Sequence, residues 1–199
     1  ADGNATSGHQ SATAKKNLQL PEESDVAKEV SALVVQALNA NPMFVAAALP
    51  HTIFPPLFNR YQGGGEFGLH VDNAIRQSRT RGAIRIRSDL SATLFLSEPE
   101  DYDGGELVMQ FGQQELSYKL SPGSALIYPS TTIHQVAPVT RGVREVAITW
   151  VQSWIADAHQ RELLIQLEEA KARAGTRDAR LLVLLESMRT NLFRMWADT

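Results

Sequence analysis

The chain has 199 residues, of which 22 are acidic and 19 basic, giving a formal net charge of −3, and 43% are hydrophobic. This length allows one ordinary domain with a small appendage, and the hydrophobic share is too high for a disordered chain. The absence of cysteine excludes disulfides, zinc–thiolate sites, iron–sulfur clusters and thiol nucleophiles. The weak negative charge gives no reason to expect nucleic-acid binding. Any metal must therefore be bound by the five histidines and by oxygen ligands.

The start of the chain is polar and shows no targeting signal. No run reaches the ~20 apolar residues that are needed to span a membrane. The opening segment, ADGNATSGHQSATAKKN, has no apolar signal core. We therefore expect a cytoplasmic protein without membrane contacts. Because the first residue is Ala1 rather than Met, we also expect a shortened N-terminus.

The first zone, residues 1–50, is expected to form a loop and helices that pack on a barrel. Within it, residues 24–48 carry apolar side chains at helical spacing, and Ser24 is a candidate N-cap. The pair Asn41-Pro42 interrupts this pattern, so a break in the helix is predicted there.

The second zone, residues 51–155, changes to short apolar or alternating runs between glycine and proline residues. Gly112-Gln113 lies between two such runs and predicts a hairpin turn. Eight runs of this kind predict a mainly β fold, a double-stranded β-helix or jelly roll, rather than a βαβ sheet.

The third zone, residues 156–199, carries two apolar stripes of helical period that are separated at Gly175. We expect a C-terminal helical extension that packs mainly on the barrel. A homodimer through the helical segments is a weaker expectation from the same stripes.

The segment GLHVDN contains His70 and Asp72, two positions apart. Residues i and i+2 of a strand point to the same face, so this imidazole and this carboxylate can bind one ion. His134, 64 residues after His70, is the candidate third ligand. Two histidines and one carboxylate form the facial triad of non-haem Fe(II) oxygenases, whereas zinc usually takes a tetrahedral set and harder ions prefer oxygen alone. The pattern favours iron.

Arg144 follows the third candidate ligand, at the predicted start of the last long strand. A guanidinium there can bind the far carboxylate of a dicarboxylate whose other end chelates the metal. Tyr61, in FNRYQGGG, can donate its hydroxyl to the same carboxylate. Three further residues share the strand parity of Arg144 and are expected to line the same interior, namely Val146, Ile148 and Trp150.

The chain resembles the Fe(II)- and 2-oxoglutarate-dependent dioxygenases in its helical tail and in three segments: RYQGGGEFGLHVDN, LFLSEPEDYDGGELVM and SPGSALIYPSTTIHQVAPVTRGVREVAITW. Within that family it is similar to the bacterial PKHD-type hydroxylases of the PiuC/YbiX group, which are associated with iron uptake. The resemblance covers essentially the whole chain. Members of the family begin with about one more helix-and-strand unit, which implies that one sheet edge is incomplete here.

The resemblance implies an enzyme that hydroxylates a C–H bond of its substrate while 2-oxoglutarate is converted to succinate and carbon dioxide. It implies Fe(2+) bound by His70, Asp72 and His134, and 2-oxoglutarate bound by Arg144 with the help of Tyr61. Dioxygen is the co-reactant, and L-ascorbate commonly keeps the iron reduced in this family. No catalytic residue beyond the metal centre is expected. The primary substrate, whether a protein side chain, a siderophore or another small molecule, stays undetermined because fold and cofactor chemistry do not define specificity.

A different interpretation uses the same three ligands in a non-catalytic jelly-roll module that binds a metal or a dicarboxylate as a sensor or store. Arg144 speaks against it in part, because a storage site needs no anchor for a co-substrate. A third interpretation, a structural partner protein, rests only on the apolar tail helices.

Two other groups of residues leave alternatives open. His9, His51 and His159 show no partner pattern and are interpreted as structural or surface residues, although the segment around His9 could fold over the mouth of the site. Five arginines between positions 76 and 87 are typical of a solvated loop. The alternative is a mobile lid that attracts an anionic substrate to the metal. These arginines are Arg76, Arg79, Arg81, Arg85 and Arg87.

Overall fold

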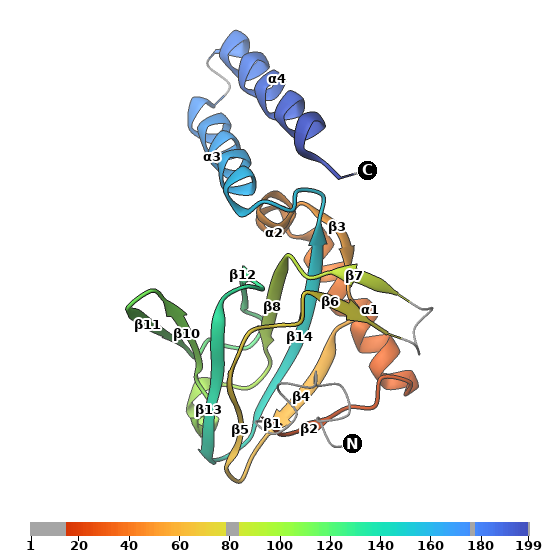
Figure 1. Ribbon diagram of the computed structural model, residues 1–199, viewed down its shortest axis with the longest axis vertical. Helices are drawn as coiled ribbons and strands as arrows, with labels where there is room; N and C mark the ends of the chain where they lie inside the picture. Colours follow the sequence, from red (N-terminus) through yellow and green to blue (C-terminus); the bar gives the residue numbers. More distant parts are fainter. Residues whose placement is uncertain (1–14, 79–83, 176–177, 199) are drawn as a thin grey trace.

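Two antiparallel sheets form the body of the protein, and helices lie at both ends of the chain (Figure 1). The structure, a computed structural model, describes residues 15–78, 84–175 and 178–198. In chain order its elements are β1 (Lys15–Lys16), β2 (Leu18–Gln19), α1 (Asp25–Ala40), α2 (Pro42–Ala48), β3 (Pro50–Ile53), β4 (Leu57–Tyr61), β5 (Gly65–His70), β6 (Ile75–Gln77), β7 (Arg85–Arg87), β8 (Leu90–Phe95), the 3-10 helix η2 (Pro99–Asp101), β9 (Asp103–Gly104), β10 (Leu107–Phe111), β11 (Gln114–Tyr118), β12 (Ala125–Pro129), β13 (Ile133–Arg141), β14 (Arg144–Ser153), α3 (Ala158–Ala174) and α4 (Ala179–Trp196).

The two sheets have six strands each, and the chain crosses repeatedly from one to the other. One sheet has the order β1-β5-β13-β10-β11, with β9 beside β13. The other has the order β12-β8-β14-β4-β2, with β3 beside β14. Strands β4, β8, β12 and β14 lie in the second sheet, whereas the intervening strands β5, β10 and β13 lie in the first. This arrangement is a jelly roll, as the pattern of short runs predicted.

One apolar core is shared by the inward faces of the two sheets. Phe95 and Val146 enter it from the second sheet, and Met109 and Val139 enter it from the first. Each of these four side chains is almost fully buried. Burial of such a side chain stabilises the fold by roughly 1.5–3 kcal/mol. The sheets are therefore held face to face by the side chains of alternate strand positions.

The junction of α1 and α2 shows why the helix is interrupted at Asn41-Pro42, where the sequence predicted a break. Ser24 caps α1, because its side chain accepts a hydrogen bond from the amide of Ala27. Asn41 ends α1 and caps α2, accepting from the amides of Met43 and Phe44, while Pro42 occupies the first turn. The expected interruption is confirmed.

No single helix within residues 15–78, 84–175 and 178–198 is long and apolar enough to cross a membrane. The pair α1 and α2, bent by 84° at its junction, passes that test when taken together, by length and composition only. Leu38 and Phe44 of this pair are buried in a cluster with Leu90 and Val151 of the second sheet.

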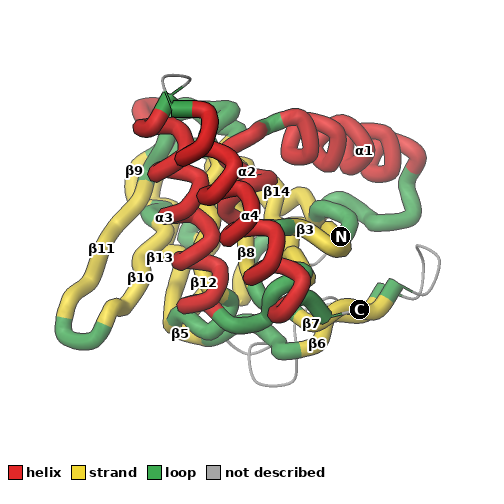
Figure 2. Tube along the Cα trace, turned by 90° about the horizontal axis from the view of Figure 1, so that it is seen from above, coloured by secondary structure: helices red, strands yellow, loops and turns green. Residues whose placement is uncertain are grey.

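Helices α3 and α4 form a hairpin at one end of the molecule, where Figure 2 shows them side by side. Leu164 of α3 is buried against Leu49 and Ile155, and part of the apolar stripe of α4 packs on the same cluster. The end of the chain is tied down by Asp198, which forms an ion pair with Arg87. The two helices that were predicted around Gly175 are confirmed.

The arginine-rich stretch after the candidate ligand Asp72 differs from the solvated loop that was expected. Its described ends form a small antiparallel hairpin, in which β6 pairs with β7 and Arg76 lies opposite Ile86. The two strands are only three residues long. Runs that short carry too little periodicity to be recognised in a sequence.

Candidate metal centre and co-substrate pocket

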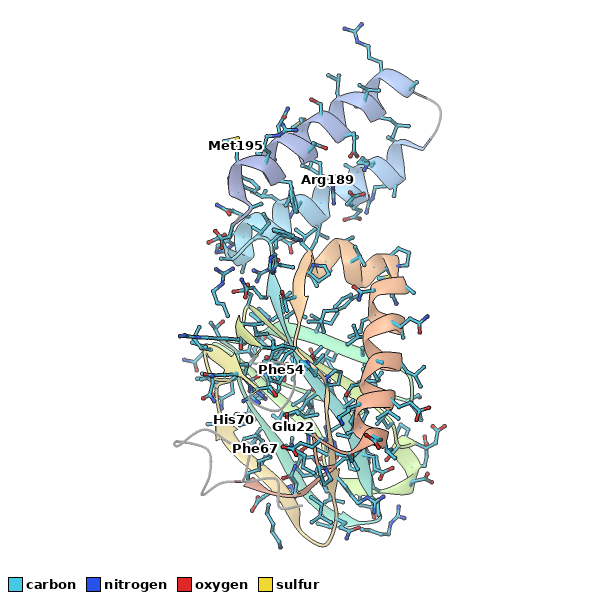
Figure 3. The ribbon with its side chains drawn as sticks, turned by 90° about the vertical axis from the view of Figure 1, so that its right-hand side faces the viewer. Glu22, Phe54, Phe67, His70, Arg189 and Met195 are labelled. Atoms are coloured by element: carbon cyan, nitrogen blue, oxygen red, sulfur yellow. The ribbon has the colours of Figure 1, made fainter. Side chains whose placement is uncertain are left out.

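His70 and His134 are direct neighbours across two paired strands. His70 is the last residue of β5, His134 is the second residue of β13, and the two form a cross-strand pair. Their ring centroids lie 4.3 Å apart. Phe67 stacks on the His70 ring at 3.7 Å, and Figure 3 shows both side chains in the same region of the β body. The tertiary pairing thus brings together two imidazoles that are 64 residues apart in sequence.

Asp72 completes the cluster just beyond the end of β5. Its Oδ1 atom lies 4.0 Å from Nε2 of His70, and its Oδ2 atom lies 3.9 Å from Nε2 of His134. One ligand atom from each of the three residues lies within 4.8 Å of the others, which is the separation that a shared metal ion requires. The structure therefore brings together the three candidate ligands.

The backbone determines which nitrogen of each imidazole faces the cluster. Nδ1 of His70 lies 2.7 Å from the carbonyl oxygen of Gly68, and Nδ1 of His134 lies 2.9 Å from that of Thr132. A carbonyl oxygen can only accept, so Nδ1 carries a proton in both rings, and in the neutral imidazole the free lone pair lies on Nε2. This is the outer-shell arrangement that orients histidine ligands in metal sites.

The charge state of the cluster also suits a metal. Burial, the neighbouring His134 and Lys15 lower the pKa of His70 to about 4, although the Gly68 carbonyl and Asp72 oppose the shift. His70 is therefore neutral near pH 7, as an imidazole ligand must be. The Asp72 carboxylate accepts a hydrogen bond of 2.6 Å from Oγ of Ser91, which holds its orientation. We call His70, Asp72, His134 and Ser91 the metal end of the pocket.

Arg144 lies at the other end of the same pocket, at the start of β14 opposite Tyr61 of β4. Its side chain is 1% exposed, and its Nε, Nη1 and Nη2 atoms have no hydrogen-bond partner among the described residues. An unpaired buried guanidinium is costly. An anionic group bound at this point would satisfy the donors of Arg144.

Aromatic side chains surround that guanidinium. The Arg144 Cζ atom lies 5.2 Å from the ring centroid of Tyr61 and 5.8 Å from that of Phe95. Burial raises the pKa of the Tyr61 and Tyr102 hydroxyls, so both remain neutral donors. The Tyr102 hydroxyl lies beside the Arg144 guanidinium and acts on its pKa, but among the described residues no hydrogen bond of ordinary geometry joins the two groups. We call Arg144, Tyr61 and Tyr102 the anchor end.

Gly105 makes room for the anchor end. Its φ of +71° lies in the region that favours glycine. A Cβ atom there would lie 2.9 Å from Cδ of Arg144 and 3.0 Å from the ring of Tyr102. Any larger residue would therefore push against the guanidinium and the tyrosine that lies beside it.

The other residues that the sequence analysis singled out lie in three different places. Val146, Ile148 and Trp150 line the same pocket as Arg144, as their strand parity predicted. His51 and His159 are exposed, which agrees with their interpretation as surface residues. His9, Arg79 and Arg81 lie outside the described residues.

Several residues of the site were missed by sequence reasoning. Tyr128 lines the pocket, and its ring lies at 5.1 Å from that of His134 in an edge-to-face arrangement. Ser91 binds Asp72, and Tyr102 borders Arg144. The alternation in SALIYP indicates which residues of that strand point inward, but only the sheet pairing places Tyr128 beside the metal end.

Comparisons with known proteins were made against family models and curated sequences. The family model described as the 2OG-Fe(II) oxygenase superfamily matches residues 56–152. A PKHD-type hydroxylase of Phenylobacterium zucineum is 55% identical over 202 residues, which cover 99% of this chain and 88% of that protein. A PKHD-type hydroxylase of Methylobacillus flagellatus is 55% identical over 204 residues, covering 100% of this chain and 88% of that protein.

Similar solved structures share little sequence with this chain. A prolyl-4-hydroxylase from Pseudomonas putida has 22% identity and a TM-score of 0.46, covering 69% of this chain and 71% of that one. A prolyl hydroxylase from Trichoplax adhaerens, solved with a hypoxia inducible factor peptide fragment, has 16% identity and a TM-score of 0.48. That match covers 75% of this chain and 66% of the other.

Proposed function

This protein belongs to the 2OG-Fe(II) oxygenase superfamily and, within it, to the PKHD-type hydroxylases, and we propose its function on that basis. It is a 2-oxoglutarate-dependent dioxygenase with a hydroxylase role. Membership of the family implies Fe(2+) as its metal and 2-oxoglutarate as its co-substrate, together with dioxygen and a substrate. The assignments of individual residues below are proposals.

His70, Asp72 and His134 are proposed as the ligands of Fe(2+). Two imidazoles and one carboxylate, gathered with their ligand atoms within 4.8 Å, match the donor set of a facial triad. The backbone carbonyls and Ser91 that hold these ligands support the assignment, because metal ligands need such outer partners.

Arg144 is proposed to bind the far carboxylate of 2-oxoglutarate, with Tyr61 as a second donor. The observation that carries this proposal is the buried guanidinium without a partner in the described chain, in the same pocket as the three ligands. A carboxylate can accept two parallel hydrogen bonds from a guanidinium, which fixes both the position and the direction of the co-substrate.

When iron and 2-oxoglutarate are bound, they supply the activation of dioxygen and the hydroxylation of a C–H bond, coupled to formation of succinate and carbon dioxide. The protein itself binds the metal and the co-substrate, orients them and shields the reacting centre from water. Val146, Ile148 and Trp150 present apolar surface along the pocket and exclude water from the reacting centre. No acid or base among the side chains is needed beyond the metal ligands.

The remaining elements of the proposal rest on the family resemblance, on the sequence and on the exposed face of α4. We propose L-ascorbate as the reductant that keeps the iron active, a cytoplasmic location and a link to iron uptake. A homodimer through α3 and α4 is also proposed, because Val183, Met188 and Met195 are exposed on α4. The primary substrate is an unidentified organic or peptidyl molecule.

The test is succinate formation by the purified protein with Fe(2+), 2-oxoglutarate and ascorbate in air, compared with a sample under nitrogen. We expect oxygen-dependent succinate, which is abolished when a chelator removes the iron. Tight metal binding without succinate under any condition would instead identify the non-catalytic metal- or dicarboxylate-binding module. The anchor end speaks against a module that binds a metal alone, because such a store needs no donors for a carboxylate; the succinate assay separates the enzyme from a module that binds a dicarboxylate.

A further inference from the structure

Arg76 is a second guanidinium in the pocket that the proposed reaction does not use. It lies on β6 of the small β6–β7 hairpin and lines the same pocket as the metal end. Its Cζ atom lies 3.8 Å from the ring centroid of Trp150 and 5.6 Å from that of Phe54. The guanidinium is thus held against an aromatic wall by cation–π contacts.

One donor of Arg76, its buried Nε–H, is left without an acceptor among the described residues. No ion pair joins Arg76 to an acidic residue in the described ranges. The indole Nε1 of Trp150 is buried in the same unpartnered state. Two neighbouring residues therefore have buried donors without acceptors, and a ligand with acceptor oxygens would satisfy such donors.

Arg76 and Arg144 serve opposite ends of the pocket. Trp150, on which Arg76 is stacked, pairs across the sheet with Ser91, and Ser91 binds Asp72 of the metal end. Arg144 lies six residues earlier on β14, or roughly 20 Å along the strand. The metal end therefore lies near Arg76 along β14, with the anchor end farther along that strand. A molecule bound on the outer side of the metal meets Arg76 rather than Arg144.

Two acidic residues lie near Arg76, and one of them is the proposed metal ligand Asp72. Burial lowers the pKa of the Arg76 guanidinium, while Asp72 and Glu22 raise it, so these two are its acidic neighbours. Asp72 is committed to the metal in the proposed site. Lys15, on β1, adds a second cation to the wall of the pocket. Figure 3 shows Glu22 in the same region as Phe54 and His70.

The other described arginines of this hairpin are engaged elsewhere. Arg87 forms ion pairs with Asp89 and Asp198, and Arg85 is exposed. Neither of them lines the pocket. Among the described residues of the arginine-rich stretch, Arg76 is thus the arginine that enters the site.

We propose that Arg76 is a specificity-determining residue that binds an oxyanion, a carboxylate or a phosphate, on the primary substrate and thereby holds its C–H bond next to the metal. The proposal rests on the proposed function, because it takes the metal end as the reacting centre. It narrows the substrate class to molecules that carry an acidic group near the position that is hydroxylated. A planar guanidinium stacked on Trp150 can make two parallel hydrogen bonds to such a group.

The experiment measures binding of simple oxyanions to the protein loaded with Zn(2+), as a redox-inactive metal, and with saturating 2-oxoglutarate, which occupies the anchor end. The probes are acetate and inorganic phosphate, with acetamide as the uncharged analogue of acetate. Dissociation constants are measured by calorimetry for the wild type, Arg76→Gln and Arg85→Gln. The two variants lose the same charge from the same hairpin, and only Arg76 faces the pocket.

We expect acetate or phosphate to bind the wild type and Arg85→Gln alike, and to bind Arg76→Gln about 10- to 100-fold more weakly. The tighter of the two anions identifies the acidic group. Equal binding to Arg76→Gln, equal binding of acetamide and acetate, or no anion binding to the wild type would each overturn the proposal. These outcomes do not depend on succinate formation, so the proposed function can fail or hold separately.

Two further measurements distinguish anion binding by Arg76 from a purely structural role: the affinity of the Arg76→Lys variant and the NMR resonance of the Arg76 side chain. The lysine variant keeps the charge without the planar fork, and we expect intermediate affinity with an unchanged melting temperature. In the wild type, the proton–nitrogen NMR resonance that Arg76→Gln removes belongs to Nε of Arg76. We expect it to shift on addition of the tighter anion, and an unmoved resonance would contradict the proposal.

Discussion

The metal end and the anchor end of the pocket differ in whether their polar atoms have hydrogen-bond partners within the protein. At the metal end, the Nδ1 atoms of both imidazoles are bonded to backbone carbonyls and the carboxylate accepts from Ser91. At the anchor end, all three nitrogens of Arg144 are buried without a partner in the described chain. Both ends are lined by the same two sheets.

In the proposed site, the difference follows from what each end would bind. A metal ion needs lone pairs held at fixed positions, so the protein satisfies every other polar atom of the ligands. A carboxylate needs donors, so the protein leaves the donors of Arg144 unsatisfied and surrounds them with aromatic rings. The cost of that unpaired charge is offset only when an anion binds.

The largest effect is expected from Asp72→Ala, which removes the charged ligand from the metal end. Without it, two imidazoles remain, and succinate formation should fall to the background of the assay. Metal content after gel filtration should fall in parallel. The control is His51→Ala, which removes an exposed imidazole. Normal turnover of Asp72→Ala would show that the metal end is assigned to the wrong residues.

The next effect is expected from Arg144→Gln, which tests the anchor end alone. The KM for 2-oxoglutarate should rise about 10- to 100-fold, while the metal content stays unchanged. The matched control is Arg60→Gln, on the neighbouring strand β4, whose side chain is paired with Glu145 at the surface. If metal binding rather than KM changed, the two ends would not be separable.

The melting temperature of Arg144→Gln also tests how the two ends of the pocket differ. Because Arg144 is an uncompensated buried charge, Arg144→Gln should not lower the melting temperature of the metal-free, 2-oxoglutarate-free protein as an ordinary core truncation does. Addition of 2-oxoglutarate and a metal should raise the melting temperature of the wild type more than that of the variant. Equal ligand-induced shifts in the two proteins would contradict this account.

A pH effect of intermediate size is expected at the metal end of the metal-free protein. His70 titrates at about 4 when folded and near its ordinary 6.5 when unfolded. Between these values the unfolded chain binds a proton that the folded protein does not, so the free energy of unfolding falls as the pH falls from 6.5 to 4. The loss is up to about 3 kcal/mol, and it is absent above pH 6.5.

Urea denaturation across that pH range measures the effect. His70→Asn, which keeps a polar side chain that does not titrate, should show a flatter pH dependence than the wild type. The exposed His51→Asn should follow the wild type. Parallel curves for the wild type and His70→Asn would show that this imidazole does not control acid stability.

The smallest effect is expected from Ser91→Ala, which removes the hydrogen bond to Asp72 but no ligand. Loss of such an outer partner typically weakens metal affinity by 10- to 100-fold, and we expect about 10-fold here because both histidines keep their carbonyl partners. Competition with a chelator measures it. Ser117→Ala, on the exposed strand β11, is the control.

Much of the fold could be predicted from local sequence. The break at Asn41-Pro42, the hairpin at Gly112-Gln113 and the two tail helices each depend on a few adjacent residues with defined backbone preferences. The hairpin β6–β7 was not predicted, because three-residue strands leave no periodic signal. The division into an N-terminal segment, a jelly-roll core and a helical extension stays a prediction.

The candidate site was predicted in part. His70, Asp72, His134, Arg144 and Tyr61 were identified from spacing and residue type, and the structure places all five in one pocket. Their roles as iron and 2-oxoglutarate ligands stay predictions that the variants above test. Residues that orient the ligands or enclose the guanidinium were missed, because no spacing pattern in the sequence marks them, namely Ser91, Tyr102 and Tyr128.

The sequence alone shows which chemistry is available: no thiol ligand, five histidines, a His–Asp pair two positions apart at His70 and Asp72, and an arginine at the predicted start of the last strand. It also determined which strand positions share a face, because that alternation is a local property of the backbone. Only the tertiary structure decided that β5 pairs with β13, so that His70 meets His134. It likewise decided that Arg76 stacks on Trp150. Such pairings join segments far apart in the chain, and they depend on sheet register and core packing that no local pattern contains.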